Sequence, residues 1–252
     1  MLTKETANEL LHSFLDIGEK MMGSGAEVNR IEDTLHRLGN AYGVERMNVF
    51  VITSSIVVTM ELPDGEKVTQ TRRLLGSGTN FTRLEKINEL SRRCCESPLS
   101  PEELRTELAN LKGDIDKRLL YIGSAVAAGS HAVFFGGTFA DGIMAALFGL
   151  LICYLQIHLP AICQNNMIFN LMASLLSGIG ICAITKFIPF IHTDKVMIGD
   201  IMLLIPGIAM TNSVRDILIG DTISGIMRLI ESLLWAAALA LGFMISIVLI
   251  GG

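Results

Sequence analysis

The sequence predicts a mixed fold: a small α+β soluble N-terminal domain, followed by an all-α polytopic membrane domain of about five transmembrane helices. Charge distribution is the first observation behind this prediction. Residues 1–118 hold 16 of the 20 Lys and Arg and 19 of the 25 Asp and Glu, so the remaining 134 residues share ten charges. Hydropathy is the second, because half of the 252 residues are hydrophobic and the mean hydropathy is +0.51. We therefore place the domain boundary at residue 118.

Within residues 1–118 the hydrophobic period changes twice. Apolar residues recur at helical spacing over 5–22 and again from Val28 to Leu38. A period of two then predicts three strands, the last two joined by the turn at 63–66. These strands are 47–52, 56–62 and 67–73. Helical spacing returns after residue 78, and Ser100-Pro101-Glu102-Glu103 has the cap, proline and glutamate that start a helix. The order of elements is typical of a small α+β domain.

Residues 119–252 contain five apolar stretches, most of them close to the roughly 20 residues that cross about 30 Å of hydrocarbon. The predicted spans are 119–135, 143–159, 167–184, 197–214 and 229–250. The N-terminus has no basic segment followed by an apolar run, so we expect no cleaved signal peptide and a cytoplasmic N-terminal domain. The distribution of Lys and Arg around the spans agrees weakly with that orientation.

Polar residues gather around the fourth stretch. Asp200 lies near its start, and Pro206-Gly207 interrupts it, where proline removes a backbone hydrogen bond. Such a break can expose carbonyls that coordinate a substrate or an ion. The alternative is that Asp200 and Glu231 are interfacial and that Pro206 is only a packing kink. The candidate site residues in this part are Asp200, Pro206, Gly207, Asn212, Arg215, Asp216, Asp221 and Glu231.

Composition and motifs exclude several classes of function. The net charge of −5 carries no basic patch, which argues against nucleic acid as a partner. The five cysteines form no CxxC pair, and we expect no metal and no cofactor. Gly76-Ser77-Gly78 lacks the Lys-Ser/Thr of a phosphate loop, and neither HExxH nor GxSxG occurs. We expect no enzymatic activity.

Several segments together resemble the threonine/serine exporter family. In the N-terminal part these are Gly25-Ala26-Glu27-Val28-Asn29-Arg30-Ile31-Glu32, Ala41-Tyr42-Gly43, Thr71-Arg72, Asn80 and the run from Arg83 to Arg92. In the membrane part they are Leu204-Ile205-Pro206-Gly207, Asn212, Asp216 and Gly220. The resemblance covers nearly the whole chain. It marks Gly25, Glu27, Arg30, Glu32, Thr71, Arg72 and Asn80 as the family motif of the soluble domain.

The resemblance implies a multi-pass exporter of small polar metabolites in the bacterial inner membrane. Threonine and serine are the named substrates, and some relatives are associated with dicarboxylates such as succinate. Long family members carry about ten spans in one chain, so this chain resembles the split form. The split form requires a second small all-membrane subunit, or self-association in the lipid bilayer. Our hypothesis is that the 200–231 region lines the path and that Asp200 or Glu231 takes up a proton, which makes export gradient-driven.

Two other functions remain open from the sequence. Ile198-Gly199-Asp200 is similar to part of the catalytic motif of intramembrane aspartyl proteases, but Met197 occupies the position of its first glycine. No second membrane aspartate lies in a Tyr-Asp pair, although two carboxylates must share the proton chemistry of such enzymes. The other alternative is a membrane-anchored sensor or scaffold whose α+β domain binds a ligand. Five closely packed spans are more than an anchor needs.

Overall fold

The computed structural model describes residues 3–74, 78–111, 113, 115–159, 163 and 165–251. Gly76 and Ser77, which belong to the segment compared above with a phosphate loop, lie outside the described residues. The chain forms two compact units, each made of segments that are distant in sequence. Unit 1 consists of Met1–Asp114 and Thr211–Leu229, and unit 2 consists of Ile115–Met210 and Ile230–Gly252.

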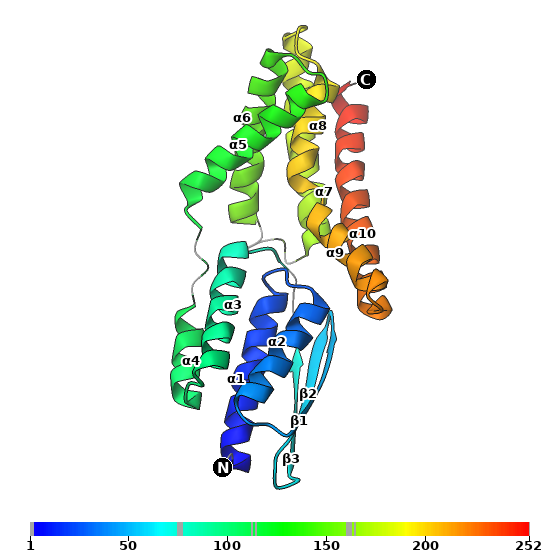
Figure 1. The fold of residues 1–252 in the computed structure, drawn as a ribbon. Helices are drawn as coiled ribbons and strands as arrows, with labels where there is room; N and C mark the ends of the chain where they lie inside the picture. Colours follow the sequence, from blue (N-terminus) through cyan, green and yellow to red (C-terminus); the bar gives the residue numbers. More distant parts are fainter. Residues whose placement is uncertain are drawn as a thin grey trace. The chain divides into compact units, whose positions relative to one another are not determined.

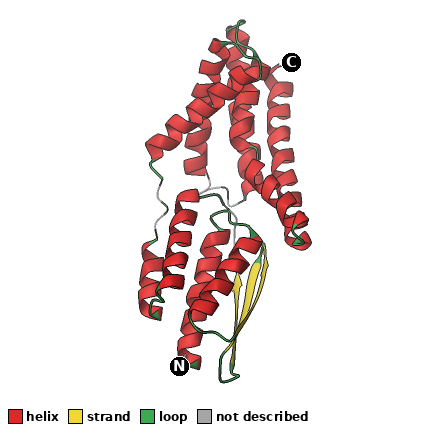
Figure 2. Cartoon of the chain, viewed as in Figure 1, coloured by secondary structure: helices red, strands yellow, loops and turns green. Residues whose placement is uncertain are grey.

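Unit 1 contains a three-stranded antiparallel sheet in the order β1-β2-β3. Helices α1 and α2 pack on one face of this sheet, and α3 and α4 pack against α1 and α2 (Figures 1 and 2). The elements are α1 (Lys4–Met22), α2 (Val28–Ala41), β1 (Arg46–Ile52), β2 (Ser55–Glu61), β3 (Lys67–Arg73), α3 (Phe81–Glu96) and α4 (Pro101–Asn110). The sequence predicted each of these elements to within a few residues.

The periodicities of the sequence account for the core of unit 1. Ile56, Val58 and Met60 alternate along β2 and are fully buried beneath the helices, as the period of two requires. Phe14 of α1 and Leu35 of α2 are also fully buried in this core. Ser100 and Glu103 form the predicted capping box at the start of α4.

A helical hairpin from the far end of the chain completes unit 1. It consists of residues 211–229, which are the later part of α9 (Gly207–Leu218) and the beginning of α10 (Thr222–Ser246). Gly220 turns the chain between the two helices with a φ of +102°, a conformation that glycine adopts readily. The two helices approach so closely that a Cβ on Gly225 would lie 2.7 Å from the carbonyl oxygen of Ser213. We call residues 211–229 the hairpin.

Unit 2 is helical and is packed largely through small residues. A Cβ on Gly129 would lie 2.8 Å from the carbonyl oxygen of Gly142, and one on Gly199 would lie 2.5 Å from that of Ala128. Such close backbone approach is typical of helix packing in membranes. The elements are α5 (Lys117–Phe134), α6 (Phe139–His158), α7 (Asn166–Phe187), α8 (Thr193–Leu204), the start of α9, most of α10 and the π-helix η2 (Ile247–Gly251).

The predicted fold class is wrong in its number of membrane helices. Among the described residues, three helices are long and apolar enough to cross a membrane: Phe139–His158, Asn166–Phe187 and Thr222–Ile250. The pair α8 and α9 adds a fourth if it is one span broken by a 53° bend. Helix α5 does not qualify, because its 18 residues include Lys117, Arg118 and His131. Five apolar stretches therefore do not become five spanning helices.

The fold class is also wrong about a separate soluble N-terminal domain. The chain is 72% helical, and its described part has ten α-helices and only the small sheet of unit 1. No clearly separate soluble domain exists, because the hairpin belongs to the same compact unit as the N-terminal elements. Hydropathy along the chain cannot detect a tertiary contact between segments about 190 residues apart. The division at residue 118 between water and lipid stays a prediction.

Candidate functional site

Asp200 is the most unusual polar residue of unit 2. Its side chain is 0% exposed, and neither carboxylate oxygen has a hydrogen-bond partner among the described residues. Its neighbour Gly199 lets α8 lie directly against α5 and α6, which excludes solvent. The hydroxyl of Ser177, on the adjacent α7, is likewise buried without a described partner. Buried polar groups are nearly always hydrogen-bonded, so Asp200 and Ser177 are exceptions among the described residues of unit 2.

The helix that carries Asp200 ends one turn later, as Pro206 predicts. Helix α8 ends at Leu204, Ile205 is extended, and α9 begins at Gly207. Proline cannot donate the backbone hydrogen bond that would continue α8, and its ring disfavours a helical residue before it. The result is the 53° bend between the two helices. The break therefore lies within one and a half turns of the buried carboxylate.

In unit 1, the hairpin docks on the turn that joins α1 to α2, residues 22–27. Arg215 Nη1 lies 2.6 Å from Glu27 Oε1, and Asn212 Nδ2 lies 3.4 Å from the carbonyl oxygen of Gly25. Arg228 Nη2 donates to the carbonyl oxygen of Ala26 at 3.2 Å. All three donors come from the hairpin and all three acceptors from one turn. The turn belongs to the predicted family motif, so the structure gives that motif a tertiary role.

The same contact contains a buried charge pair. Arg228 Nη1 lies 3.2 Å from Asp216 Oδ2, and both side chains are almost completely buried. The two groups attract each other as charges, but neither Asp216 oxygen accepts a hydrogen bond from the described residues. Removing one partner from such a pair leaves an uncompensated buried charge. Arg228 thus joins the hairpin both to Asp216 and to the 22–27 turn, and it was not among the candidate site residues of the sequence.

The structure divides the predicted membrane-site residues between the two units. Those in unit 2 are Asp200, Pro206, Gly207 and Glu231, and those in unit 1 are Asn212, Arg215, Asp216 and Asp221. Neither unit contains the whole set. That these residues line one transport path stays a prediction.

The other residues of the soluble family motif are dispersed over unit 1. Gly25 has a φ of +93°, and a Cβ on it would lie 3.0 Å from the carbonyl oxygen of Gly78, so glycine is required there. Asn80 caps α3 by accepting from the Arg83 amide, and it donates to the carbonyl oxygen of Gly113. These residues fix the loops around the 22–27 turn. Their role is structural support of the surface on which the hairpin docks.

Glu32 and Arg72 instead hold the sheet to its covering helices, and Thr71 lies within the sheet. Glu32 accepts a hydrogen bond from the Val51 amide at 3.0 Å, which ties α2 to β1. Arg72 of β3 lies 2.6 Å from Asp16 of α1. Thr71 lies opposite Val57 in the sheet. All three residues therefore lie where they stabilise the sheet or its contact with the covering helices.

Arg30 lines a shallow groove between α2 and α3, with a volume of about 260 Å³. Arg37 and Arg92 also line it, but so do Asp33 and Glu96, and Asp33 already pairs with Arg37 at 3.0 Å. Charges of both signs alternate along the groove. The groove therefore does not present a surface of one charge sign to a charged ligand.

Sequence reasoning missed a second buried carboxylate in unit 2. Asp141 is 0% exposed at the start of α6, where it forms a capping box with Thr138. It also accepts from the backbone amide of His192 at 2.7 Å, and His192 Nδ1 lies 2.9 Å from it. The spacing from Thr138 to Asp141 could have indicated the cap. No local signal could have indicated His192, which lies 51 residues away.

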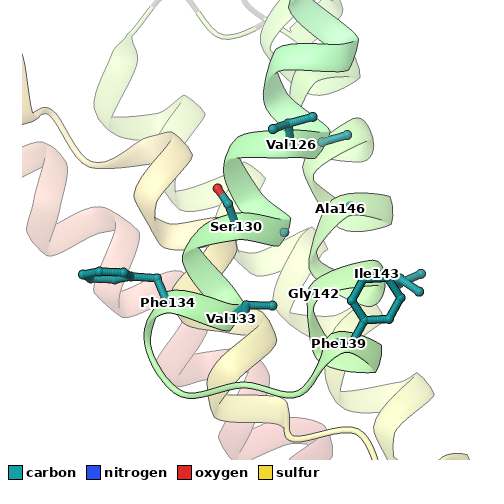
Figure 3. Close-up of a pocket in the computed structure, with 10 residues that line it drawn as sticks. Val126, Ser130, Val133, Phe134, Phe139, Gly142, Ile143 and Ala146 are labelled. Atoms are coloured by element: carbon teal, nitrogen blue, oxygen red, sulfur yellow. The ribbon is translucent and has the colours of Figure 1, made fainter.

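One groove among the described residues of unit 2 is apolar. It lies between α5 and α6 and has a volume of about 700 Å³ (Figure 3). Val126, Val133, Phe139 and Ile143 line it, and Ser130 contributes the hydroxyl seen in Figure 3. No ionisable side chain lines this groove, so it does not suit a small charged metabolite. The described residues also contain no group of three or more His, Cys, Asp or Glu that could hold a metal ion.

Comparison with known proteins agrees with the resemblance of the sequence. The profile of the family described as "Putative threonine/serine exporter" matches residues 12–250. The chain is 21% identical over 236 residues to a threonine/serine exporter of Corynebacterium glutamicum, covering 90% of this chain and 48% of the relative. It is 22% identical over 247 residues to a "Probable threonine/serine exporter" of Mycobacterium tuberculosis, covering 95% and 46%. The chain thus spans about half the length of these two relatives.

A third relative has a similar length. It is the "Probable succinate transporter subunit YjjP" of Klebsiella aerogenes, 24% identical over 245 residues, covering 92% of this chain and 90% of the relative. No solved structure matches the chain. The family match spans both units, and the apolar helices α6, α7 and α10 are those of a multi-pass membrane protein. The chain therefore belongs to the threonine/serine exporter family.

Proposed function

We propose that this chain is a subunit of a gradient-driven exporter of small polar metabolites, either amino acids such as threonine and serine or a dicarboxylate such as succinate. The family match and the names of the three relatives support this function. All three relatives are bacterial, so we place the exporter in the cytoplasmic membrane with the N-terminal elements in the cytoplasm. Its task is transport and not catalysis.

A second membrane subunit completes the transporter in this proposal. The Klebsiella relative, which has nearly the length of this chain, is named a transporter subunit, and the two exporter relatives are about twice as long. Three or four spanning helices are also few for a carrier, since many carriers place their site between two structural repeats. The additional helices would come from a second small membrane protein or from a second copy of this chain.

The observation that carries the proposal is the buried, unpartnered carboxylate of Asp200. An ionised carboxylate in a solvent-free bundle costs several kcal/mol unless it is paired. A group like this is stable only with a bound proton or cation, or when water reaches it in another state of the protein. Alternation between those states is what couples a carrier to an ion gradient. The break at Pro206 lies close to this carboxylate, and the helix can change its conformation at the break.

An efflux experiment tests the proposal. The gene is deleted in its native host, so that any partner subunit remains, and cells are loaded with radiolabelled threonine, serine or succinate. Restoring the unchanged chain should restore efflux of at least one substrate. The Asp200→Asn variant should fall at least tenfold below it, because the amide cannot exchange a proton. Lys195→Gln is the control on the same helix, since it also removes one charge and Lys195 is a partly exposed residue that pairs with Asp194, and it should export normally.

One result would overturn the proposed export function, and another would overturn the proposed role of Asp200. Equal efflux from the deletion strain and the restored strain, for all three substrates, would favour a sensor or scaffold. Normal efflux by Asp200→Asn would leave the exporter standing but would remove Asp200 from its coupling mechanism. Comparable amounts of each variant in the membrane fraction must be shown by immunoblot.

A further inference from the structure

A polar pocket lies where the end of α7 meets the start of α8 in unit 2. Its volume is about 370 Å³, within the range of sites for small molecules. Lys186 and Thr185 of α7, Thr193 and Asp194 of α8, and Ile247 of η2 line it. The pocket differs from the apolar groove between α5 and α6, because both signs of charge and two hydroxyl groups face the same small space.

The two charged residues of this pocket differ in their partners, and Lys186 is the one available to a ligand. Among the described residues, Lys186 forms no ion pair with a carboxylate, whereas Lys195 lies 3.3 Å from Asp194. The Thr193 hydroxyl donates to that of Thr185 at 2.8 Å, so the two hydroxyls sit together within the pocket. An ammonium group on α7 and a carboxylate on α8 that line the same pocket match a molecule that carries one charge of each sign. A dicarboxylate would place its second carboxylate against Asp194.

One residue that lines the pocket lies close to Asp200 along α8. Met197 lines the pocket, is almost completely buried, and lies one helical turn before Asp200 on α8. Methionine is unbranched with three rotatable bonds, and it can change conformation at little cost. Met197 thus belongs both to the lining of the pocket and to the turn of α8 that precedes Asp200.

We infer that this pocket is a binding site for a small zwitterionic amino acid, with Lys186 binding its carboxylate and Asp194 its ammonium group, and that Met197 is the gate between this site and Asp200. The inference rests on the proposed function and extends it, because it selects amino acids over dicarboxylates. The two threonine hydroxyls provide partners for a hydroxyl on the ligand's side chain. The binding site at Lys186 and the access to Asp200 then belong to one transport pathway, which runs along α7 and α8.

Direct binding tests the site without requiring transport. The full chain is placed in lipid nanodiscs, and the dissociation constant for radiolabelled threonine is measured by scintillation proximity, with unlabelled succinate as competitor. Lys186→Gln should weaken binding at least tenfold, since a charge-assisted hydrogen bond contributes about 1.5–3 kcal/mol and 1.4 kcal/mol is a factor of ten. Lys186→Arg keeps the charge and should stay within threefold of the unchanged chain. Lys195→Gln, a cation outside the pocket lining, should also stay within threefold.

Three outcomes would overturn the binding site: no threonine binding by the unchanged chain, equal binding by Lys186→Gln, or succinate competing as well as threonine. Each of these outcomes can be distinguished from failure of the proposed export function. If the deletion strain regains threonine efflux with Lys186→Gln at the normal rate and half-saturation, the exporter stands and this site is wrong. If no substrate is exported at all, the proposed function is wrong.

The gate is tested by chemical access to position 200. In a chain whose five native cysteines are replaced by serine or alanine, Asp200→Cys is treated with a water-soluble thiosulfonate reagent in sealed vesicles. Adding Met197→Ala should raise the labelling rate at least fivefold. Adding Leu204→Ala is the control, because Leu204 is buried on the same helix and does not line the pocket. Equal rates with and without Met197→Ala would contradict the gate.

Discussion

In unit 1 the large apolar side chains point inward, whereas in unit 2 many of them point outward. Phe14, Leu35 and Ile56 of unit 1 are fully buried, but Phe134 and Phe187 of unit 2 are 80% and 87% exposed. The buried positions of unit 2 instead include many small residues, such as Ala128, Ala132, Ala145 and Ala173. Unit 1 is thus built like a protein in water, and unit 2 like one whose outer surface meets lipid.

The difference indicates which force stabilises each unit. Removing apolar surface from water stabilises unit 1. That force is absent between helices in lipid, where close packing and polar contacts remain. A buried polar side chain therefore stands out more in the packing of unit 2 than in the core of unit 1, and Asp200 is the clearest example. The hairpin is intermediate, because its described buried residues on α9 are the polar Ser213 and Asp216.

The largest expected effect is on the core of unit 1. Phe14→Ala should lower the free energy of unfolding by about 3–5 kcal/mol, because it leaves a cavity in a close-packed core. Hydrogen exchange of the full chain should show faster exchange throughout α1, α2 and the sheet, and unchanged exchange in α6 and α7. Phe81→Ala is the matched control, because Phe81 is 58% exposed. Equal acceleration in both units would contradict their separate stabilisation.

A somewhat smaller effect is expected where the hairpin docks. Arg228→Gln should destabilise unit 1 by about 3 kcal/mol, because it leaves Asp216 buried without its cation. Arg215→Gln should cost less than about 1 kcal/mol, because the Arg215–Glu27 pair is largely exposed. Hydrogen exchange of α9 and of residues 22–27 measures the loss of stability in both variants. If the two variants exchange alike, the buried pair does not hold the hairpin.

The packing of unit 2 is tested by adding one methyl group. Gly199→Ala should cost about 1–3 kcal/mol, since its Cβ would press on the Ala128 carbonyl and push α8 from α5. Gly123→Ala is the control on α5, where a Cβ meets no atom within 4 Å. Thermal unfolding in detergent micelles compares the two variants. Equal melting temperatures would show that α8 is not packed through Gly199.

The smallest effect is a pH dependence of unit 1. Burial raises the pKa of Glu32 above its usual 4.5, although the hydrogen bond from the Val51 amide opposes the shift. The folded state therefore holds this proton more tightly than the unfolded state does. Stability should decline slightly as pH rises from about 4.5 through the raised pKa. Glu32→Gln should remove that part of the slope in urea titrations between pH 4 and pH 7, and an unchanged slope would contradict it.

Local patterns were sufficient to predict the elements of unit 1. Alternation at Ile56, Val58 and Met60 defined β2, and Ser100 and Pro101 defined the start of α4. Pro206 likewise defined the break between α8 and α9. Each of these signals acts over a few residues, where backbone preferences and caps decide the structure.

Tertiary contacts were not predictable in this way. Arg228 reaches Ala26 across 202 residues, and His192 reaches Asp141 across 51. A single sequence contains no local trace of either contact. The number of spans was wrong for a different, local reason, because α5 begins at Lys117 and Arg118 and its polar residues lower its hydropathy. Asp200 was identified as a candidate, but its lack of a partner became evident only from the packing of α8.

The central claim is that the carboxylate of Asp200 couples export to a proton gradient. Inside-out membrane vesicles from the native host test it most directly, because export appears as uptake that an acid interior should drive. With the unchanged chain, a pH gradient should stimulate threonine uptake at least fivefold, and nigericin should abolish the stimulation. With Asp200→Asn the gradient should have no effect, whereas Lys195→Gln should respond normally. Gradient-stimulated uptake by Asp200→Asn at the normal rate would contradict the claim.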